Sequence, residues 1–358
     1  MSKLIQITVV IIALMLVASS IILVTNMVSK EETTQTYEIR DALGRRITVG
    51  SNITRVVSLS PSLTEIMFEL GLDHLLIAVD EQSLRETPYL NASSKLIERN
   101  ITDVGGYWWS NVNLEKILSL SPDIVLVDKG AHAPLREFFE SYNITAVYFN
   151  GGAARSLEEV YLDILLIGRI FNKQVEAEEV VSQIKQKFQM YENAGSRFEN
   201  ITVLVVVGID QAIWVAGPET FIGDVLSKLG VNNACRSGTW VGASLEMIAQ
   251  WNPTVIIIAS DNITPDIIAA SGLEKLSSSI FVIEDKLMLN MINRPSSSLK
   301  HLPQMLISLL EHPNEAQNSS DSPLSLSVSG ELIEFPNRLI PHEDMGNSYS
   351  ATSTLFLL

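Results

Sequence analysis

The chain has 358 residues, enough for two ordinary domains, and its 46% hydrophobic and 18% charged residues are typical of a globular protein. A net charge of −16 and a pI of about 4.8 repel phosphate-rich partners, which excludes a nucleic-acid-binding role. The single cysteine, Cys235, excludes an internal disulfide and a paired-cysteine metal site.

The first element is an apolar segment, Leu4 to Val24, with no charge between Lys3 and Lys30. Its length matches a bilayer core of roughly 30 Å, whereas a cleaved signal usually has an apolar part of about 7 to 15 residues. We therefore expect residues 1–28 to be a transmembrane anchor rather than a cleaved signal. No cysteine follows the segment, which excludes anchoring by a lipid-modified cysteine.

Acceptor triplets for N-glycosylation indicate that the rest of the chain lies outside the cytoplasm. Each triplet alone is a weak signal, but their number fits an extracytoplasmic glycoprotein. They begin at Asn52, Asn91, Asn100, Asn143, Asn200, Asn262 and Asn318.

After a polar linker, the next hundred or so residues alternate between strand and helix patterns. Tyr37 to Gly50 has the pattern of a hairpin. Val56 to Leu59 predicts a strand, and Ser62 with Glu65 predicts a capping box that opens the following helix. The alternation continues to Phe149 and favours a parallel sheet covered by helices.

Residues from Ser156 onward predict two helices and no strand, which indicates a helical spacer. Ser156 and Glu159 predict a second capping box. Strand and helix patterns resume at Ile201, and a Ser-, Asn- and Pro-rich tail predicts disorder. The predicted organisation is an anchor (1–28), a linker (29–36), an N-terminal α/β lobe (37–155), a spacer (156–198), a C-terminal α/β lobe (199–313) and a tail (314–358).

An internal repeat connects the two lobes. The stretch from Trp109 to Pro122 matches the stretch from Trp240 to Pro253 at one constant offset, and an apolar strand follows both. Identical residues in the repeat include Leu114 with Leu245 and Glu115 with Glu246. The lobes are therefore expected to be two copies of one α/β plan.

Local physics explains much of the repeated phrase. Asn113 and Ser244 are suited to N-caps, and each proline stops its helix ahead of a buried strand. Glu115 and Glu246 fall in the first turn, where the helix dipole favours an acid by about 0.3 to 1 kcal/mol. The tryptophans could equally pack between the lobes, so helix electrostatics and packing compete with any functional interpretation.

The chain resembles the substrate-binding proteins of ABC importers for vitamin B12, haem and ferric siderophores, whose two Rossmann-like lobes are joined by a long helix. Four stretches carry the resemblance from Tyr37 to about Pro313: DALGRRITV, RVVSLSPSLTEIMFELG, VGGYWWSNVNLEKILSLSPDIVLV and GPETFIGDVLSKLGVNNA. The resemblance implies a transport protein with no enzymatic activity and no cofactor. Its ligand would be a small metal chelate.

The resemblance also assigns roles to residues of the repeat. In the family, one exposed glutamate on each lobe docks against arginines of the permease, and the matching residues here are Glu115 and Glu246. Equivalent acids on two similar lobes suit a two-fold permease, which works with its ATPase.

Tryptophans stand six residues before each docking glutamate in the vitamin B12 binders, where they contact the corrinoid. Trp109 and Trp240 match this spacing. Aromatic rings suit a flat, largely apolar macrocycle because they offer large contact areas. The other expected ligand contacts are Tyr107, Trp108, Ser60, Pro61, Gly217 and Arg294.

One loop departs from the vitamin B12 binders. Those proteins carry aromatic residues just before a proline that follows the second strand, whereas this chain has Arg85-Glu86-Thr87-Pro88. Anionic siderophores usually need an arginine-rich cleft, and the cationic candidates here are Lys129, Arg236 and Arg294. A corrinoid is therefore the favoured ligand, with a ferric siderophore or haem as the alternative.

Other functional classes have less support. The histidines are scattered without metal-ligand spacing, at positions 74, 132, 301, 312 and 342. No nucleophile motif, phosphate-binding loop or dinucleotide fingerprint nominates an enzyme. An anchored ligand sensor remains the third alternative, since it would keep the ligand site without delivering to a permease.

Overall fold

A computed structural model of the protein describes Met15 and residues 36–192, 197–198, 200–260, 263–276, 278–283 and 285–311. Apart from Met15, the predicted membrane anchor lies outside these ranges, as does the predicted tail. Within the described ranges, no helix is both long and apolar enough to cross a membrane. The described residues belong to one compact unit.

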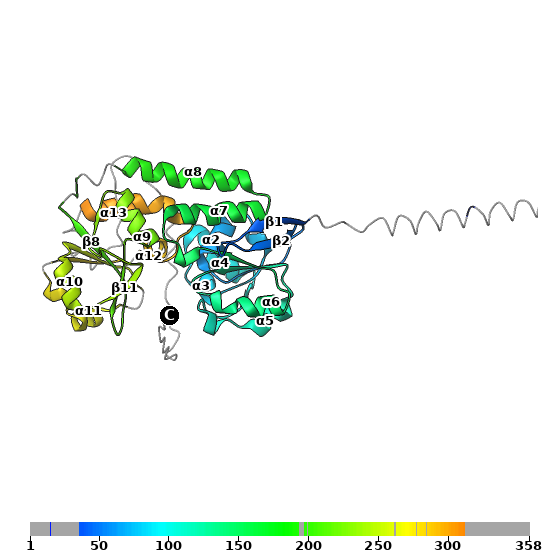
Figure 1. Cartoon of the computed structure of the whole chain (residues 1–358), viewed down its shortest axis with the longest axis horizontal. Coiled ribbons are helices and arrows are strands. Elements are labelled where there is room, and N and C mark those ends of the chain that lie inside the picture. The colour runs from blue at the N-terminus through cyan, green and yellow to red at the C-terminus, as the bar shows by residue number, and fades with distance from the viewer. Residues whose placement is uncertain are drawn as a thin grey trace, which may run out of the picture. The chain divides into compact units, whose positions relative to one another are not determined.

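The N-terminal lobe is built on a parallel five-stranded sheet, in the order β5-β4-β3-β6-β7 (Figure 1). The central strands β3 and β6 are fully buried, as a sheet covered on both faces requires. A separate hairpin, β1 with β2, confirms the predicted one. The strands are β1 (Thr36–Arg40), β2 (Arg46–Gly50), β3 (Val56–Ser58), β4 (Leu76–Val79), β5 (Thr102–Asp103), β6 (Ile124–Asp128) and β7 (Ala146–Phe149).

Helices between the strands cover this sheet, which confirms the predicted alternation of strand and helix. The helices of the N-terminal lobe are α2 (Pro61–Glu69), α3 (Glu81–Arg85), α4 (Ala92–Glu98), α5 (Leu114–Leu120) and α6 (Arg136–Ser141).

The C-terminal lobe follows a related plan with a mixed sheet, in the order β11-β9-β8-β12-β13. β8, β12 and β13 are parallel, but β9 and β11 are antiparallel, so the expectation of two equal copies is wrong for this edge. The short turn after β8 forces an antiparallel partner. The strands are β8 (Thr202–Ile209), β9 (Ile213–Ala216), β10 (Asn232–Asn233), β11 (Trp240–Ala243), β12 (Val255–Ile258) and β13 (Ser279–Val282).

The helices of this lobe include the last helix of the described chain. They are α9 (Phe221–Lys228), α10 (Leu245–Trp251), α11 (Pro265–Ser271), α12 (Lys286–Asn293) and α13 (Leu302–Glu311), with the 3-10 helix η8 (Ser297–His301) between the last two.

Two helices join the lobes, α7 (Leu157–Ile170) and α8 (Gln174–Tyr191), and they lie side by side along one side of both lobes (Figure 1). The Ser156 hydroxyl accepts the Glu159 N–H at 3.3 Å, which confirms the predicted N-cap of α7. α8 has 18 residues and therefore a length of about 27 Å, enough to bridge the lobes. The long connecting helix implied by the resemblance is α8, with α7 packed beneath it.

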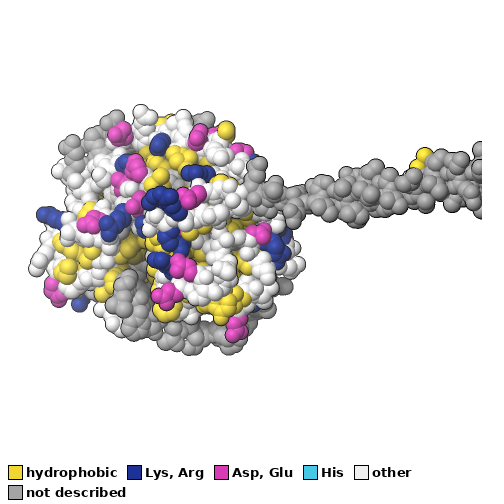
Figure 2. Space-filling model, turned by 45° about the vertical axis from the view of Figure 1, so that its right-hand side comes forward, with side chains coloured by type: hydrophobic (Ala, Val, Ile, Leu, Met, Phe, Trp, Pro, Cys, Tyr) yellow, Lys and Arg dark blue, Asp and Glu magenta, His cyan; other side chains and the backbone are white. Residues whose placement is uncertain are grey.

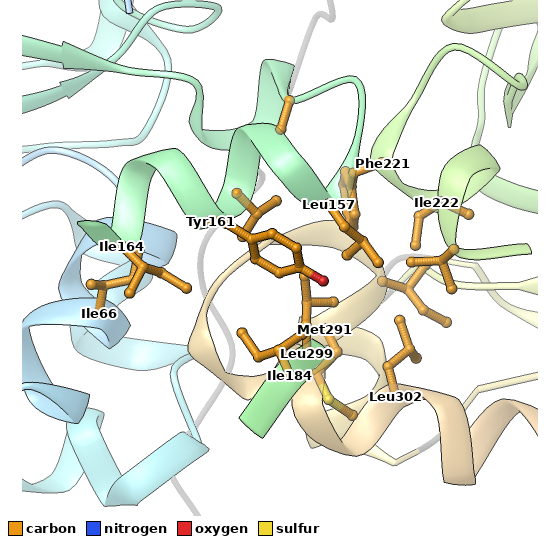
Figure 3. Packing of buried hydrophobic residues seen from close by; sticks show 14 of the residues in the cluster. Ile66, Leu157, Tyr161, Ile164, Ile184, Phe221, Ile222, Met291, Leu299 and Leu302 are labelled. Atoms are coloured by element: carbon orange, nitrogen blue, oxygen red, sulfur yellow. The ribbon is translucent and has the colours of Figure 1, made fainter. Parts of the chain in front are cut away.

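A single apolar cluster runs through both lobes and the two connecting helices (Figure 3). It combines buried side chains from α2, α7, α8, α9, α12 and α13. Ile66 of α2 faces Ile164 of α7, while Leu157 at the start of α7 lies beside Phe221 of α9. Each lobe has a second, smaller cluster on the other face of its sheet. Because the main core crosses the lobe boundary, the lobes cannot separate without exposing it.

The predicted capping box of Ser62 with Glu65 is wrong. Helix α2 begins two residues earlier than predicted, at Pro61, with Ser60 instead of Ser62 as the N-cap, and the Ser60 side chain makes no capping bond. Proline fixes the backbone for the first helical position and needs no N–H partner there. The Glu65 carboxyl points away from the helix end, toward residues of the other lobe.

Asparagine triplets have a structural explanation besides glycosylation. The described acceptors Asn52, Asn91, Asn100, Asn143 and Asn200 are all exposed. Asn91, Asn100 and Asn143 have positive φ, a conformation that asparagine tolerates at helix ends and turns. Glycosylation stays a prediction. Turns that favour asparagine and lead into strands also explain why these triplets are frequent.

Replacing Ile164 by alanine tests the shared core. The side chain is fully buried at the centre of α7, so we expect a loss of about 2 to 5 kcal/mol in the free energy of unfolding. Leu162→Ala is the matched control, because Leu162 is 60% exposed on the same helix. Urea unfolding of both variants gives the comparison, and equal losses would contradict a core that passes through α7.

Candidate functional site

A cavity of about 550 Å³ lies between the two lobes. One wall is formed by α3, α4 and the loop between them, and the other by α12 with residues of β8 and the end of β12. Most of its side chains are polar. The residues that line it are Gln82, Arg85, Glu86, Thr87, Pro88, Asn91, Ser93 and Ser94 from the N-terminal lobe and Val207, Ala259, Ser260, Lys286, Leu289, Asn290, Asn293 and Arg294 from the C-terminal lobe.

Arg294 crosses this cavity and connects the lobes. Its guanidinium donates to the Glu86 carbonyl at 2.8 Å and forms an ion pair with the Glu86 carboxylate at 2.5 Å. It also donates to Oδ1 of Asn290 at 2.9 Å, which fixes the side chain on its own helix. Of the ligand contacts expected from the sequence, Arg294 is the one that lines the cavity.

Cations gather on the surface of an otherwise acidic protein. Figure 2 shows lysine and arginine side chains clustered near the centre of one face, with acidic side chains among them. Of the other two expected cationic candidates, Lys129 donates to the Asn150 side chain at 2.6 Å, and Arg236 is exposed. Neither lines the interlobe cavity.

Glu65 lies beside the cavity at the lobe junction and is completely buried. Its carboxylate accepts hydrogen bonds from the Asn290 amide and from the hydroxyls of Ser296 and Ser298, all in the C-terminal lobe. Burial raises the pKa of Glu65 to about 7, although these bonds and the charge of Arg294 act in the opposite direction. A polar connection therefore accompanies the apolar core across the junction.

A second polar connection lies next to it. Lys300 of η8 pairs with Glu69 of α2 at 2.7 Å, and both side chains are largely buried. The Tyr89 hydroxyl donates to the same carboxylate at 2.6 Å, and the Lys300 ammonium lies 5.9 Å from the centroid of the Tyr89 ring. Together with Arg294, these contacts hold the lobes in one relative position.

The Tyr107-Trp108-Trp109 loop is held by a buried aspartate at the end of β6. Asp128 accepts the Tyr107 hydroxyl at 2.8 Å and the Gly152 N–H at 2.6 Å with one oxygen. Its other oxygen accepts the N–H groups of Gly130 and Ala131. Burial, followed by the charge of Asp128, raises the pKa of Tyr107, so its hydroxyl stays protonated as a donor.

Trp108 and Trp109 are presented to solvent by this loop, with 41% and 48% of their surface exposed. The Trp108 ring meets the Tyr107 ring edge to face at 5.4 Å. Trp109 begins the 3-10 helix η3 (Trp109–Asn111), just ahead of α5. Exposed tryptophans on a loop held by buried hydrogen bonds are suited to contact a ligand.

Trp240 is placed differently from its partner in the repeat. It opens strand β11, is only partly exposed, and lies 6.4 Å from the Phe221 ring in an edge-to-face contact. Phe221 belongs to the shared core, so one face of the Trp240 ring packs against that core, as the alternative to ligand contact predicted. The expected pair of facing tryptophans is therefore asymmetric, with one ring on a loop and the other on a sheet edge.

Ser60, Pro61 and Gly217, expected on the cleft floor, are buried in this conformation and do not line the cavity. The Ser60 hydroxyl has no hydrogen-bond partner among the described residues. Gly217 packs against backbone so closely that an added Cβ would lie 2.3 Å from the Gly238 carbonyl oxygen. Only glycine fits there.

Glu115 and Glu246 are both exposed and occupy equivalent positions in α5 and α10. The N-caps are the predicted ones: Asn113 accepts the Lys116 N–H at 2.9 Å and Ser244 accepts the Met247 N–H at 3.3 Å. A hydrogen bond from Ser244 lowers the pKa of Glu246. The repeat thus presents one exposed acid on each lobe.

Sequence reasoning missed Glu65 and Asp128 as organisers of the site. Both are acidic residues within or beside apolar stretches, a signal for a buried carboxyl, but their partners lie far away in the sequence. Glu86 was noted only as a departure from an aromatic pattern, although it forms the contact with Arg294. Among the described residues, no cluster of three or more histidine, cysteine, aspartate or glutamate side chains could hold a metal ion.

Comparison with known proteins adds independent information. A family model described as periplasmic binding protein matches residues 56–279. An uncharacterized ABC transporter substrate-binding lipoprotein of Bacillus subtilis is 29% identical over 244 residues, which cover 66% of this chain and 71% of that protein. A cobalamin-binding protein of Halobacterium salinarum is 26% identical over 221 residues, covering 61% of this chain and 57% of the relative.

Among solved structures, a molybdate-binding periplasmic protein of Haemophilus influenzae has a TM-score of 0.64 at 18% identity. The alignment covers 79% of this chain and 94% of that one. At this level of identity the likeness shows the fold alone: two α/β lobes with helices between them.

Replacing Glu65 by glutamine tests its protonation. The folded protein keeps the Glu65 proton up to about pH 7, whereas an ordinary glutamate releases it near pH 4.5. The folded state therefore binds more protons in this window, so the free energy of unfolding falls as the pH rises through it, by about 3 kcal/mol. In Glu65→Gln this part of the pH dependence is absent.

Urea unfolding of both proteins between pH 4.5 and pH 8 measures the difference. Glu178→Gln, which removes an exposed acid from α8, is the control and should parallel the wild type. Parallel curves for Glu65→Gln and the wild type would show that Glu65 does not titrate in this range.

Proposed function

Because the chain belongs to the periplasmic binding protein family, we propose that it captures a corrinoid between its two lobes and delivers it to an ABC permease. The relatives are substrate-binding proteins, so the chain is a transport component and not an enzyme. The observation that carries the proposal is the polar interlobe cavity, with exposed tryptophans on a neighbouring loop.

The cavity wall suits a ligand with many uncharged hydrogen-bonding groups. A corrinoid carries amide side chains around an apolar ring, and amide and hydroxyl side chains such as Gln82, Asn91 and Ser260 can pair with them. Thr87 belongs to the cavity wall, and its buried hydroxyl has no hydrogen-bond partner among the described residues. Trp109 and Trp240 would contact the ring.

Delivery requires docking, for which Glu115 and Glu246 are suited. They are exposed, acidic and equivalent in the two lobes, as a permease with two similar basic pockets would require. An uncleaved N-terminal anchor would keep the protein beside the permease and raise its effective concentration there. We therefore place the folded part outside the cytoplasm, at the membrane surface.

Titration of the full chain with cobalamin tests the ligand. We expect binding at micromolar concentration or tighter, detected by calorimetry and by the visible spectrum of cobalamin. Haem and a ferric trihydroxamate, titrated in parallel, test the alternative ligands. Absence of cobalamin binding would refute the corrinoid proposal, and binding of either other chelate in its place would select the alternative.

The double variant Trp109→Ala/Trp240→Ala tests the aromatic contacts. Loss of two large ring contacts should weaken cobalamin binding by about 100-fold or more, since anchoring aromatic residues contribute about 2 kcal/mol or more each. Trp251→Ala is the control, because Trp251 packs against the smaller apolar cluster of the C-terminal lobe and is not among the expected ligand contacts. A double variant that lowers the melting temperature strongly but leaves affinity intact would restore packing as the explanation.

Charge reversal of the docking acids tests delivery. Glu115→Lys/Glu246→Lys should lower uptake in cells by about tenfold or more while cobalamin affinity stays within about twofold, because the acids lie outside the cavity. Glu178→Lys on α8 is the control for an added surface charge. Unchanged uptake in the double variant would favour an anchored sensor over a transport protein.

A further inference from the structure

Arg294 is the least exposed cation of the interlobe cavity. Only 16% of its side-chain surface is exposed, compared with 67% for Arg85, and Lys286 is also exposed. A shielded guanidinium facing a ligand cavity would attract anionic groups strongly, because little water screens it. Its neighbours decide whether that attraction is available to a ligand.

Carboxylates already surround Arg294. Glu86 contacts it directly with both its carbonyl and its carboxylate. The buried carboxyls of Glu65 and Asp80 lie close enough to interact with it electrostatically. Asn290 connects two of these groups, since its amide donates to Glu65 and its oxygen accepts from Arg294. The ion pair with Glu86 therefore compensates the charge of Arg294 before any ligand enters.

We propose that Glu86 is a specificity-determining residue, which occupies Arg294 and thereby keeps polyanionic chelates out of the cavity. The inference rests on the proposed function in taking this cavity as the ligand site. Glu86 lines the cavity, so a ligand between the lobes meets a carboxylate there. An entering anion is repelled by Glu86 unless it displaces that carboxylate from Arg294, whereas a ligand with uncharged polar groups meets no such repulsion.

The strength of the effect follows from the geometry. Glu86 approaches Arg294 to 2.5 Å at the cavity wall, where the Arg294 side chain is largely shielded from solvent and the Glu86 side chain is 46% exposed. A negatively charged ligand group that comes close to the Glu86 carboxylate is repelled, and such repulsion lowers the affinity for that ligand by about tenfold or more. The selectivity should therefore reside in one carboxylate and not in the total charge of the protein.

Glu86→Gln tests the proposal, because it removes the charge and leaves the carbonyl that Arg294 also contacts. The probes are a hexadentate ferric tricatecholate, which is a trianion, and a hexadentate ferric trihydroxamate of similar size, which is neutral. Tryptophan fluorescence quenching of the full chain gives both affinities. We expect the ratio of tricatecholate to trihydroxamate affinity to rise at least about tenfold in Glu86→Gln.

Glu81→Gln is the matched control. Glu81 begins α3, which ends just before Glu86, has nearly the same side-chain exposure (43% compared with 46%) and pairs with Arg85 instead of Arg294. The affinity ratio should change there by less than about threefold. In Glu86→Gln/Arg294→Gln the ratio should return to near the wild-type value, because the uncompensated cation is gone.

An unchanged ratio in Glu86→Gln, an equal rise in Glu81→Gln, or a rise that persists without Arg294 would each overturn the proposal. Failure to detect tricatecholate binding to Glu86→Gln would overturn it as well. Cobalamin titration of the wild type is read separately. The corrinoid proposal can therefore fail while the proposed role of Glu86 holds. Likewise, cobalamin can bind while the affinity ratio shows that Glu86 has no such role.

Discussion

The apolar core that runs through both lobes is the constraint on which the other features depend. Side chains from α2, α7, α8, α9 and α12 form one cluster, so the lobes share the hydrophobic stabilisation that most two-domain proteins keep separate. Opening the lobes widely would expose this surface. Motions between ligand-free and bound states are therefore expected to be small compared with those of hinged binding proteins.

A closed junction of this kind creates a need for polar partners. Glu65 sits inside it without contact to water, and an unpaired carboxylate there would be costly. Donors from Asn290, Ser296 and Ser298 meet this need only in one relative position of the lobes. The apolar core holds the lobes together, and the hydrogen bonds of Glu65 fix their relative position.

Most local features could be predicted from the sequence, although the capping box placed at Ser62 and Glu65 was wrong because the helix begins at Pro61. Both copies of the repeated phrase have their predicted N-caps, and both helices end in a left-handed residue just before the proline, Ser121 and Asn252. Such features depend on neighbours within a few residues along the chain. Features that depend on distant partners were missed or wrong, including the role of Glu65, the antiparallel edge of the second sheet and the strand setting of Trp240.

The cavity illustrates the same limit. Its walls come from residues about 200 positions apart, such as Glu86 and Arg294, whose separation along the chain is 208. The sequence could identify Arg294 as a candidate and Arg85-Glu86-Thr87-Pro88 as a departure, but not that the two segments meet. Only the packing of α12 against the end of α3 turns these separate observations into one site.

Rigid lobes also restrict how ligand occupancy could reach the permease. Trp109 and Glu115 belong to one short stretch, with Asn113 hydrogen-bonded to Val104 at 2.7 Å between them. Trp240 and Glu246 are likewise separated only by β11 and the Ser244 cap. If the ligand contacts these tryptophans as proposed, its binding would act on segments that continue directly into α5 and α10, which carry Glu115 and Glu246. In a protein whose core opposes large hinge motion, such local ordering would be a short physical route from the ligand to the proposed docking acids.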